Sequence, residues 1–252
     1  LNKKRDSDKN VGVIDSDALG NFADINVAES LRRISGISVE NDQGEGRYVT
    51  VRGMNADLNA MTINGVSTAS PEDRRGVILD GVPTDLLESM TVYKTLTPNL
   101  DADTIGGAID LETISAFSYG SNFVKFKAET SRNDLTKDSS NPKLSGTYTT
   151  VIPQESGDLG IAFVISSQER HIMADNNETG GWGSTYVDDD YEMRYYDLTR
   201  ERDGIVLNLD YVSNSGSKTY LHAFHNEYVD TEYRAKWEVR DVMEEYTPTI
   251  SG

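Results

Sequence analysis

The segment DADTIGGAIDLE, which begins at Asp101, has oxygen-bearing residues at several positions where a calcium loop needs them. Asp101 and Asp103 stand at positions 1 and 3 of the EF-hand pattern, and Glu112 stands at its closing position. Position 5 is Ile105, which has no side-chain oxygen, and the end of the segment alternates like a β-strand. We therefore predict a strand at 107–113 and no bound ion.

The other residues with catalytic potential do not form a recognisable constellation. The chain has no cysteine, and its histidines are His171, His222 and His225. His222 and His225 are three apart on an expected strand, so they should face opposite sides and share no metal. The aspartates at 188–190 could imitate glycosidase carboxylates, but such a run on a loop is typical of a solvated turn. We predict no enzymatic activity and no cofactor.

Charge and hydropathy narrow the classes of protein. Of the 252 residues, 42 are acidic and 24 are Lys or Arg, which gives a net charge of −18 and argues against nucleic acid as a partner. No apolar run approaches the ~18–20 residues of a transmembrane helix. The opening LNKKRDSDKN lacks the apolar core of a signal peptide. A β-barrel stays compatible with this composition because its strands leave only a weak hydropathy trace.

Before residue 115, short helices and short strands should alternate. An amphipathic helix is expected at 25–36, with Asn26 as its cap and Glu29 completing a capping box. A second helix is expected at 85–90, and one helical turn near 100–105. The expected strands are 37–40, 47–53, 60–66, 76–83, 91–96 and 107–113.

After residue 115 the pattern changes to strands of period two. Short connections at 153–158 and 213–217 contrast with long polar ones at 132–142 and 173–190. Short turns at one end and long loops at the other are typical of an outer-membrane meander, although a secreted β-sandwich also alternates. The expected strands are 123–130, 143–152, 159–172, 204–212 and 218–229.

The first half contains the short motifs VRG at 51–53, ING at 63–65 and IGGAIDLET at 105–113. Through these specific pieces, residues 11–115 closely resemble the plug domain of TonB-dependent outer-membrane receptors, especially the large subfamily linked to carbohydrate uptake. The resemblance is looser after residue 115, where 191–211 looks like an early barrel hairpin.

The resemblance implies an α+β plug at 1–115 followed by about six antiparallel strands of a transmembrane β-barrel at 116–252. Six strands cannot enclose a plug, because plugged transporter barrels have about 22. The barrel should therefore be incomplete in this chain, which we interpret as a fragment of a larger receptor.

The function implied by the resemblance is energy-coupled import across the outer membrane of a Gram-negative bacterium. Its partners would be a TonB-type energy-coupling protein, outer-membrane lipid and a small to medium extracellular ligand such as an oligosaccharide. Two alternatives stay open: a plug-like periplasmic binding or signalling module, and a secreted calcium- or carbohydrate-binding β-protein.

Two loops that join plug strands, 54–59 and 67–75, should form outward apices by this resemblance. Trp182, between glycines, could stack on a sugar ring or simply pack its loop. Arg52 and Arg75 match arginines of the family and could pair with carboxylates on barrel strands. The expected ligand-binding residues of the two loops are Asn55, Asp57, Asn59, Glu72, Asp73 and Arg74.

Overall fold

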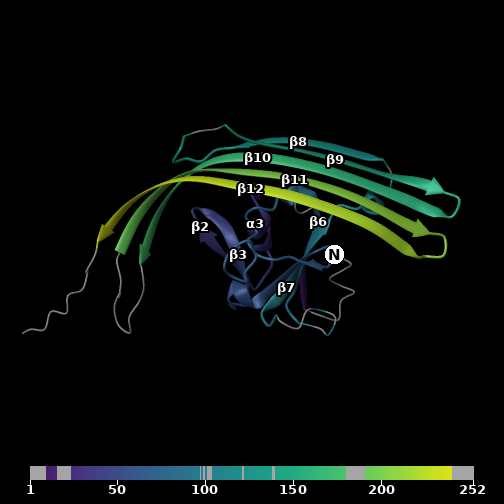
Figure 1. Ribbon diagram of the computed structural model, residues 1–252, viewed down its shortest axis with the longest axis horizontal. Coiled ribbons are helices and arrows are strands. Elements are labelled where there is room, and N and C mark those ends of the chain that lie inside the picture. The colour runs from purple at the N-terminus through teal and green to yellow at the C-terminus, as the bar shows by residue number, and fades with distance from the viewer. Residues whose placement is uncertain are drawn as a thin grey trace, which may run out of the picture.

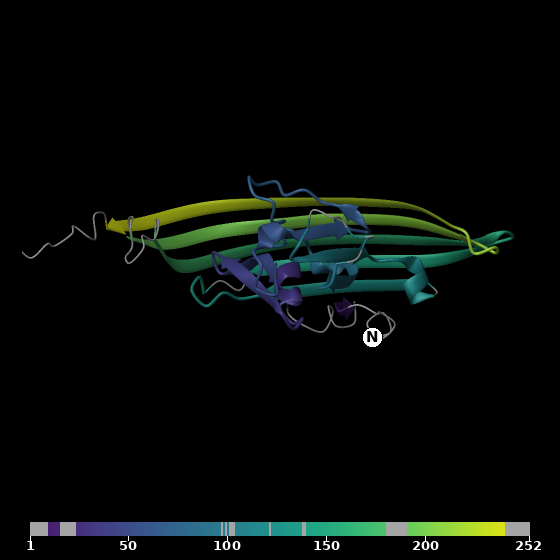
Figure 2. The ribbon, with the colours of Figure 1, turned by 90° about the horizontal axis from the view of Figure 1, so that it is seen from below.

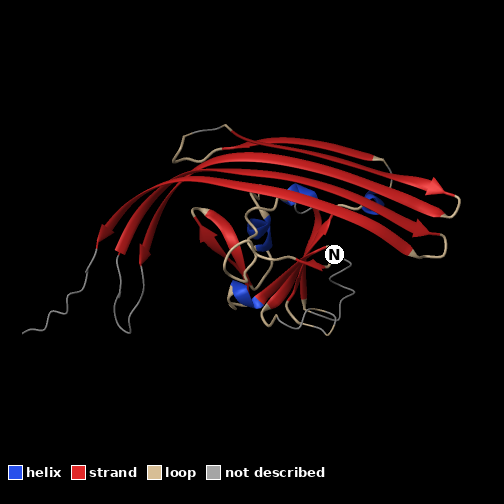
Figure 3. Cartoon of the chain, in the orientation of Figure 1, coloured by secondary structure: helices blue, strands red, loops and turns tan. Residues whose placement is uncertain are grey.

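The computed structural model describes residues 10–15, 24–96, 98, 100, 104–120, 122–137, 140–179 and 191–239. Figure 1 shows two bodies: a small N-terminal unit, and a wide curved sheet whose concave side covers it. Strands dominate both bodies, and the helices are short (Figure 3). We call these bodies the N-terminal unit (described residues up to 120) and the long-strand sheet.

The N-terminal unit is built on a five-stranded mixed sheet in the order β1-β6-β7-β4-β5. Its central strands are largely buried, although they carry polar residues such as Ser89, Thr91 and Asp110 between the apolar ones. Met90 and Val92 of β6 and Leu111 of β7 are fully buried. The strands are β1 (Val11–Asp15), β4 (Asn59–Ile63), β5 (Val66–Ser67), β6 (Leu87–Tyr93) and β7 (Gly107–Thr113).

A hairpin of β2 (Ile37–Asp42) and β3 (Glu45–Val51) packs beside this sheet together with helix α3 (Val27–Leu31). Asn26 caps the helix as expected, because its side chain accepts from the Glu29 N–H at 3.0 Å. The Glu29 carboxylate does not complete a capping box; it accepts from the Gly46 N–H at 3.0 Å. The cap therefore also fixes the helix to β3.

Three single-turn elements join these parts to each other and to the second body. They are η1 (Ala56–Leu58), η2 (Thr84–Leu86) and α4 (Ala116–Tyr119), whose left-handed C-cap is Gly120. Such turns are too short to be stable alone, so packing against the sheets must hold them.

The long-strand sheet is antiparallel throughout, in the order β12-β11-β10-β9-β8. Its last three strands have 22 or 23 residues, against the ~9–11 that cross a bilayer. The strands are β8 (Phe123–Ser131), β9 (Asn141–Gln154), β10 (Gly157–Thr179), β11 (Tyr191–Ser213) and β12 (Lys218–Val239).

Side chains of the long strands alternate between a face that covers the N-terminal unit and an outward face. Figure 2 shows the N-terminal unit lying across all five strands. The outward face is apolar over the half of the sheet nearer the short turns and turns acidic beyond it, at Glu169, Glu201 and Asp203. We call the apolar part the outward belt; its exposed members are Val124, Phe126, Leu144, Tyr148, Ile152, Phe163, Ile165, Ile205, Leu207 and Leu221.

Several sequence-based expectations need correction. Residues 76–83 form no strand; they run as a loop that buries Leu79, whose N–H donates to the Arg47 carbonyl at 3.0 Å. The helix expected at 85–90 is one 3₁₀ turn followed by β6. The hairpin expected within 191–211 is the single strand β11.

The boundaries of other elements also differ. Helix α3 is shorter than 25–36, β10 extends through Thr179 into the expected loop, and α4 is a helix beyond residue 115. The strand at 107–113 is confirmed. The described part of the second half has five strands, against the six expected, and residues 240–252 lie outside it. No helix among the described residues has the length and apolarity needed to span a membrane.

Candidate functional site

The N-terminal unit and the long-strand sheet are joined by a buried ionic group, which we call the arginine cluster. Glu45, at the start of β3, accepts from Arg170 on β10 and from Arg200 and Arg202 on β11. The Glu45 and Arg200 side chains are 1% and 0% exposed, and the Oε2–Nη1 distance is 2.9 Å. Arg200 and Arg202 are two residues apart, so the strand period places both on the covered face.

The charge balance of this cluster keeps Glu45 ionised. Burial alone raises the pKa of its carboxyl, but the guanidiniums of Arg202, Arg170 and Arg200 outweigh burial and lower the pKa below its ordinary value. Arg200 also donates to Asp230 of β12 at 3.2 Å, so the pairing extends along the sheet. An ionic group this deeply buried is tolerated only because its charges are paired.

A second buried carboxylate, Asp80, touches the same region with weaker pairing. Tyr228 of β12 donates to it at 3.3 Å, and Arg47 Nη1 lies 3.7 Å from its Oδ2. The Arg202 Nε–H donates to its backbone carbonyl at 2.5 Å. Burial raises the pKa of Asp80 above its ordinary value, and the nearby guanidiniums, Arg47 foremost, do not fully offset this. The surroundings of Asp80 therefore stabilise its charged form less than those of Glu45 do.

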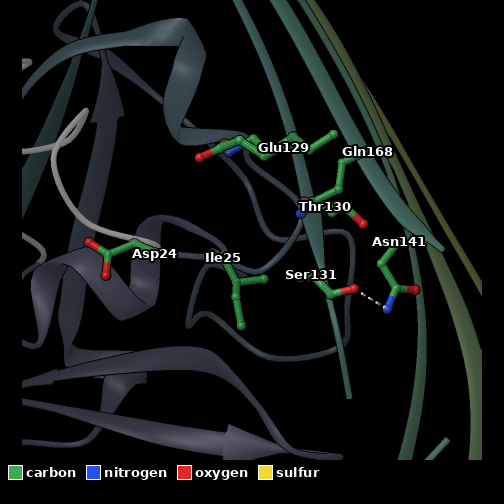
Figure 4. A pocket seen from close by; sticks show the side chains of 8 residues that line it. Asp24, Ile25, Glu129, Thr130, Ser131, Asn141 and Gln168 are labelled. Carbon is green, nitrogen blue, oxygen red and sulfur yellow. Dashed lines mark hydrogen bonds and ion pairs between the residues drawn. The ribbon is translucent and has the colours of Figure 1, made fainter. Parts of the chain in front are cut away.

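Asp85 makes the third ionic contact, with the ammonium groups of Lys143 on β9 and Lys127 on β8. Burial raises the pKa of Asp85, but Lys143 and then Lys127 outweigh it and lower the pKa below its ordinary value. A pocket of about 80 Å³ lies nearby between the two bodies, with Gln168 and Ser131 on its wall (Figure 4).

Between the ionic contacts the two bodies meet through apolar side chains and glycines. Leu86 packs with Val164 and Val206 in a buried cluster. A Cβ at Gly204 of β11 would collide with Leu86, and one at Gly160 of β10 would come within 2.7 Å of Phe117. Glycine at both positions therefore lets the N-terminal unit lie directly on the strands.

The expected ligand-binding loops meet at Tyr48 of β3, in what we call the Tyr48 cluster (Arg47, Tyr48, Asp57, Glu72 and Arg74). Glu72 accepts from both Arg47 and Tyr48. The Arg74 guanidinium lies 3.9 Å from the Tyr48 ring centroid and donates to Asp57 at 3.1 Å. The Gly76 N–H, and then Arg74, lower the pKa of Asp57. Glu72 and Arg74 are each about one-third exposed, whereas Tyr48 is buried, so the cluster is accessible through its charged groups.

The other expected ligand residues lie around this cluster. Asn55 caps η1 by accepting from the Asp57 N–H at 2.9 Å, and Asp73 is exposed. Asn59 donates to the Val49 carbonyl at 3.1 Å. Trp182 lies outside the described residues, as do Asp101, Asp103 and 188–190. Ligand binding by any of these residues stays a prediction.

Arg52 and Arg75 were expected to pair with carboxylates on barrel strands. Arg52 donates to the Gly106 carbonyl at 3.1 Å, within the N-terminal unit, and Arg75 is exposed. Their pairing with barrel carboxylates stays a prediction. In the described ion pairs between the two bodies the charges are the other way round from this expectation: the carboxylates belong to the N-terminal unit and the cations to the long strands. The signal for this was in the sequence: the two arginines of TRERD alternate in a strand.

The histidines are placed as their spacing predicts. His222 lies 2.8 Å from Asp210 on the covered face, whereas His225 points outward. His171 lies 2.7 Å from Asp197. The described residues contain no group of three or more metal-ligating side chains.

Comparison with known proteins gives a family match for the N-terminal unit and a fold match for both bodies. Residues 3–108 match the family described as TonB-dependent Receptor Plug Domain. No curated protein matches the chain's sequence significantly.

Two solved structures share the fold across most of the chain. The ferric citrate transporter FecA in its unliganded form superposes with a TM-score of 0.55 over 92% of this chain, at 14% identity. The ferripyoverdine receptor of the Pseudomonas aeruginosa outer membrane, bound to ferripyoverdine, gives a TM-score of 0.51 over 92%, at 13% identity. The chain spans 42% and 32% of their lengths, respectively. The chain therefore has the fold of a TonB-dependent receptor plug domain followed by antiparallel strands of an incomplete receptor barrel.

Proposed function

We propose that this chain is part of an outer-membrane receptor of a Gram-negative bacterium that imports an oligosaccharide, driven by a TonB-type energy-coupling protein. The observation that carries the proposal is the placement of the plug. It lies on the inward face of barrel strands through paired, buried charges, and it keeps a polar cluster exposed beside them. The reaction is transport, so no bond is made or broken.

The Tyr48 cluster supports an oligosaccharide as the ligand. Its carboxylates accept hydrogen bonds from hydroxyl groups, and its guanidiniums donate to ring and hydroxyl oxygens. The Tyr48 ring is buried beneath the Arg74 guanidinium, so a ligand would meet the exposed polar groups of Glu72 and Arg74. Asn55 and Asp73 at its margin add further polar groups.

Arg47 gives the ligand site a physical connection to the barrel. Its guanidinium pairs with Glu72 in the Tyr48 cluster and lies 3.7 Å from Asp80, which accepts from Tyr228 of β12. A ligand that recruits Glu72 would weaken its hold on Arg47. Arg47 would then be free to move toward Asp80, so occupancy would change a plug–barrel contact.

The experiment uses the full-length receptor in whole cells. We expect it in the outer-membrane fraction, where it should import a labelled oligosaccharide at a rate that a protonophore abolishes. Recovery in the periplasm would refute the receptor assignment. Import of ferric citrate or haem but of no oligosaccharide would keep the receptor and refute the ligand class.

A further inference from the structure

The outward belt contains a hollow on β8, β9 and β10 that the plug contacts do not explain. It has a cavity volume of about 510 Å³. Three small residues form its base, Ala128, Gly146 and Ser167, and larger apolar side chains surround them. The walls are Phe126, Leu144 and Ile165.

Gly146 is the residue that opens the hollow. Its φ is not positive, and a Cβ there would meet Ile165 and Phe126 at 3.5 Å, an ordinary contact. Glycine weakens a strand interior, so it needs a reason to be there. Gly160 and Gly204 have one, since Phe117 and Leu86 of the plug approach them closely. At Gly146 no plug residue makes such an approach, and the missing side chain leaves space on the outward face.

The dimensions of the hollow fit one extended hydrocarbon chain. Phe126 and Ile165 flank Gly146 in register on the neighbouring strands. Neighbouring strands are about 4.8 Å apart, so these walls stand on backbones about 10 Å apart, which is too narrow for a helix with its side chains. The hollow also ends where the outward face turns polar, at Ser167 and then Glu169. A molecule with an apolar chain and a polar head matches that change.

We propose that this hollow is a binding site for an acyl chain of a membrane lipid, with the lipid's polar head at the Ser167 end. This rests on the proposed outer-membrane location. The site differs from general lipid contact along the outward belt because a chain seated over Gly146 is covered on both sides. It would hold its lipid longer than Ile205 and Leu207 of β11 hold theirs.

The test uses the full-length receptor in phospholipid vesicles that contain a phospholipid with a diazirine on its acyl chain. After photolysis, we expect labelled peptides to cluster at 126–128, 144–146 and 165–167 rather than at 205–207. Gly146→Leu should lower the label in the hollow about tenfold, the change expected when about two methylene groups lose their burial. Ser167→Leu fills the same space from β10 and should act alike.

Ala223→Leu is the matched control, because Ala223 is a small outward residue of β12 away from the hollow. It should leave the label in the hollow unchanged. Even labelling of the belt that neither filling variant alters would refute the site. Cross-links between two receptor copies at 126–128 would refute it in favour of a self-contact. Absence of label on every strand would instead refute the membrane location.

Discussion

Glu45 of the plug and Arg200 of β11 form an ion pair from which solvent is excluded, with their side chains 1% and 0% exposed. Arg170 and Arg202 converge on the same carboxylate. The Glu45 carboxylate offsets the free-energy cost of desolvating these three guanidiniums. We therefore expect this one side chain to determine how stably the plug is bound to the barrel strands.

Glu45→Gln should therefore loosen the plug in the full-length receptor. The substitution leaves buried guanidiniums without their counter-charge, which costs about 3–5 kcal/mol. Urea titration followed by protease accessibility of the plug measures the loss. Asp80→Asn is the matched control, since Asp80 is also buried but has longer contacts and a raised pKa. If Asp80→Asn costs as much as Glu45→Gln, the special role of the arginine cluster is wrong.

Acid should weaken the plug through Glu45. Its folded-state pKa is lower than its ordinary value of 4.5, so its contribution to stability is complete above that value and is lost as the pH falls through the folded-state pKa. Asp80 should have the opposite effect on stability. Because its pKa is raised in the folded state, its protonation stabilises the folded state relative to the unfolded chain. The plug stability of the Glu45→Gln variant should depend less on pH below 4.5 than that of the wild type. Equal slopes would contradict this.

Gly204→Ala should disturb the apolar contact between plug and barrel. The new methyl group collides with Leu86, which is fully buried, and overpacking of this kind costs about 1–3 kcal/mol. Leu86→Ala removes the obstacle, so the double variant should be more stable than the sum of the two single changes predicts. Gly146→Ala is the control, since its Cβ meets only ordinary contacts. Strict additivity would indicate that the two residues do not touch.

Arg74→Ala should weaken ligand binding without unfolding the plug. Arg74 is about one-third exposed and joins Asp57 to the face of Tyr48, so its loss removes a donor and disorders both neighbours. Calorimetry on the full-length receptor should register a loss of about tenfold in affinity for the oligosaccharide, the equivalent of one hydrogen bond to a charged group. Lys218→Ala, at the short-turn end of β12, should change nothing. An unchanged affinity for Arg74→Ala would exclude the Tyr48 cluster as the ligand site.

The strand alternation of the second half was predictable, because a strand covered on one face has alternating covered and outward residues, which gives the sequence a period of two. Val124 and Phe126 face outward, and Lys127 faces the plug. The cap at Asn26 was also predictable, because it depends on residues three apart. These are local signals, and the structure agrees with them.

The failures concern residues whose position is decided by distant partners. The apolar run at 76–83 resembles a strand, yet Leu79 is drawn into the core as part of a loop. The buried contact between Glu45 and the long strands was not predicted from the sequence. It depends on the register that brings Glu45 opposite Arg170 and Arg200, which are more than 100 residues away.

A disulfide that locks the plug to the barrel tests whether import requires the plug to move. A Cβ on Gly81 would lie 3.3 Å from the Cβ of Tyr228, close to disulfide geometry, and this chain has no other cysteine. The measurement is the rate of oligosaccharide import by the receptor carrying Gly81→Cys and Tyr228→Cys. We predict that import stops in the oxidised receptor, while ligand binding persists, and returns on reduction. Equal import rates before and after oxidation, with the disulfide verified, would show that import does not require the plug to move.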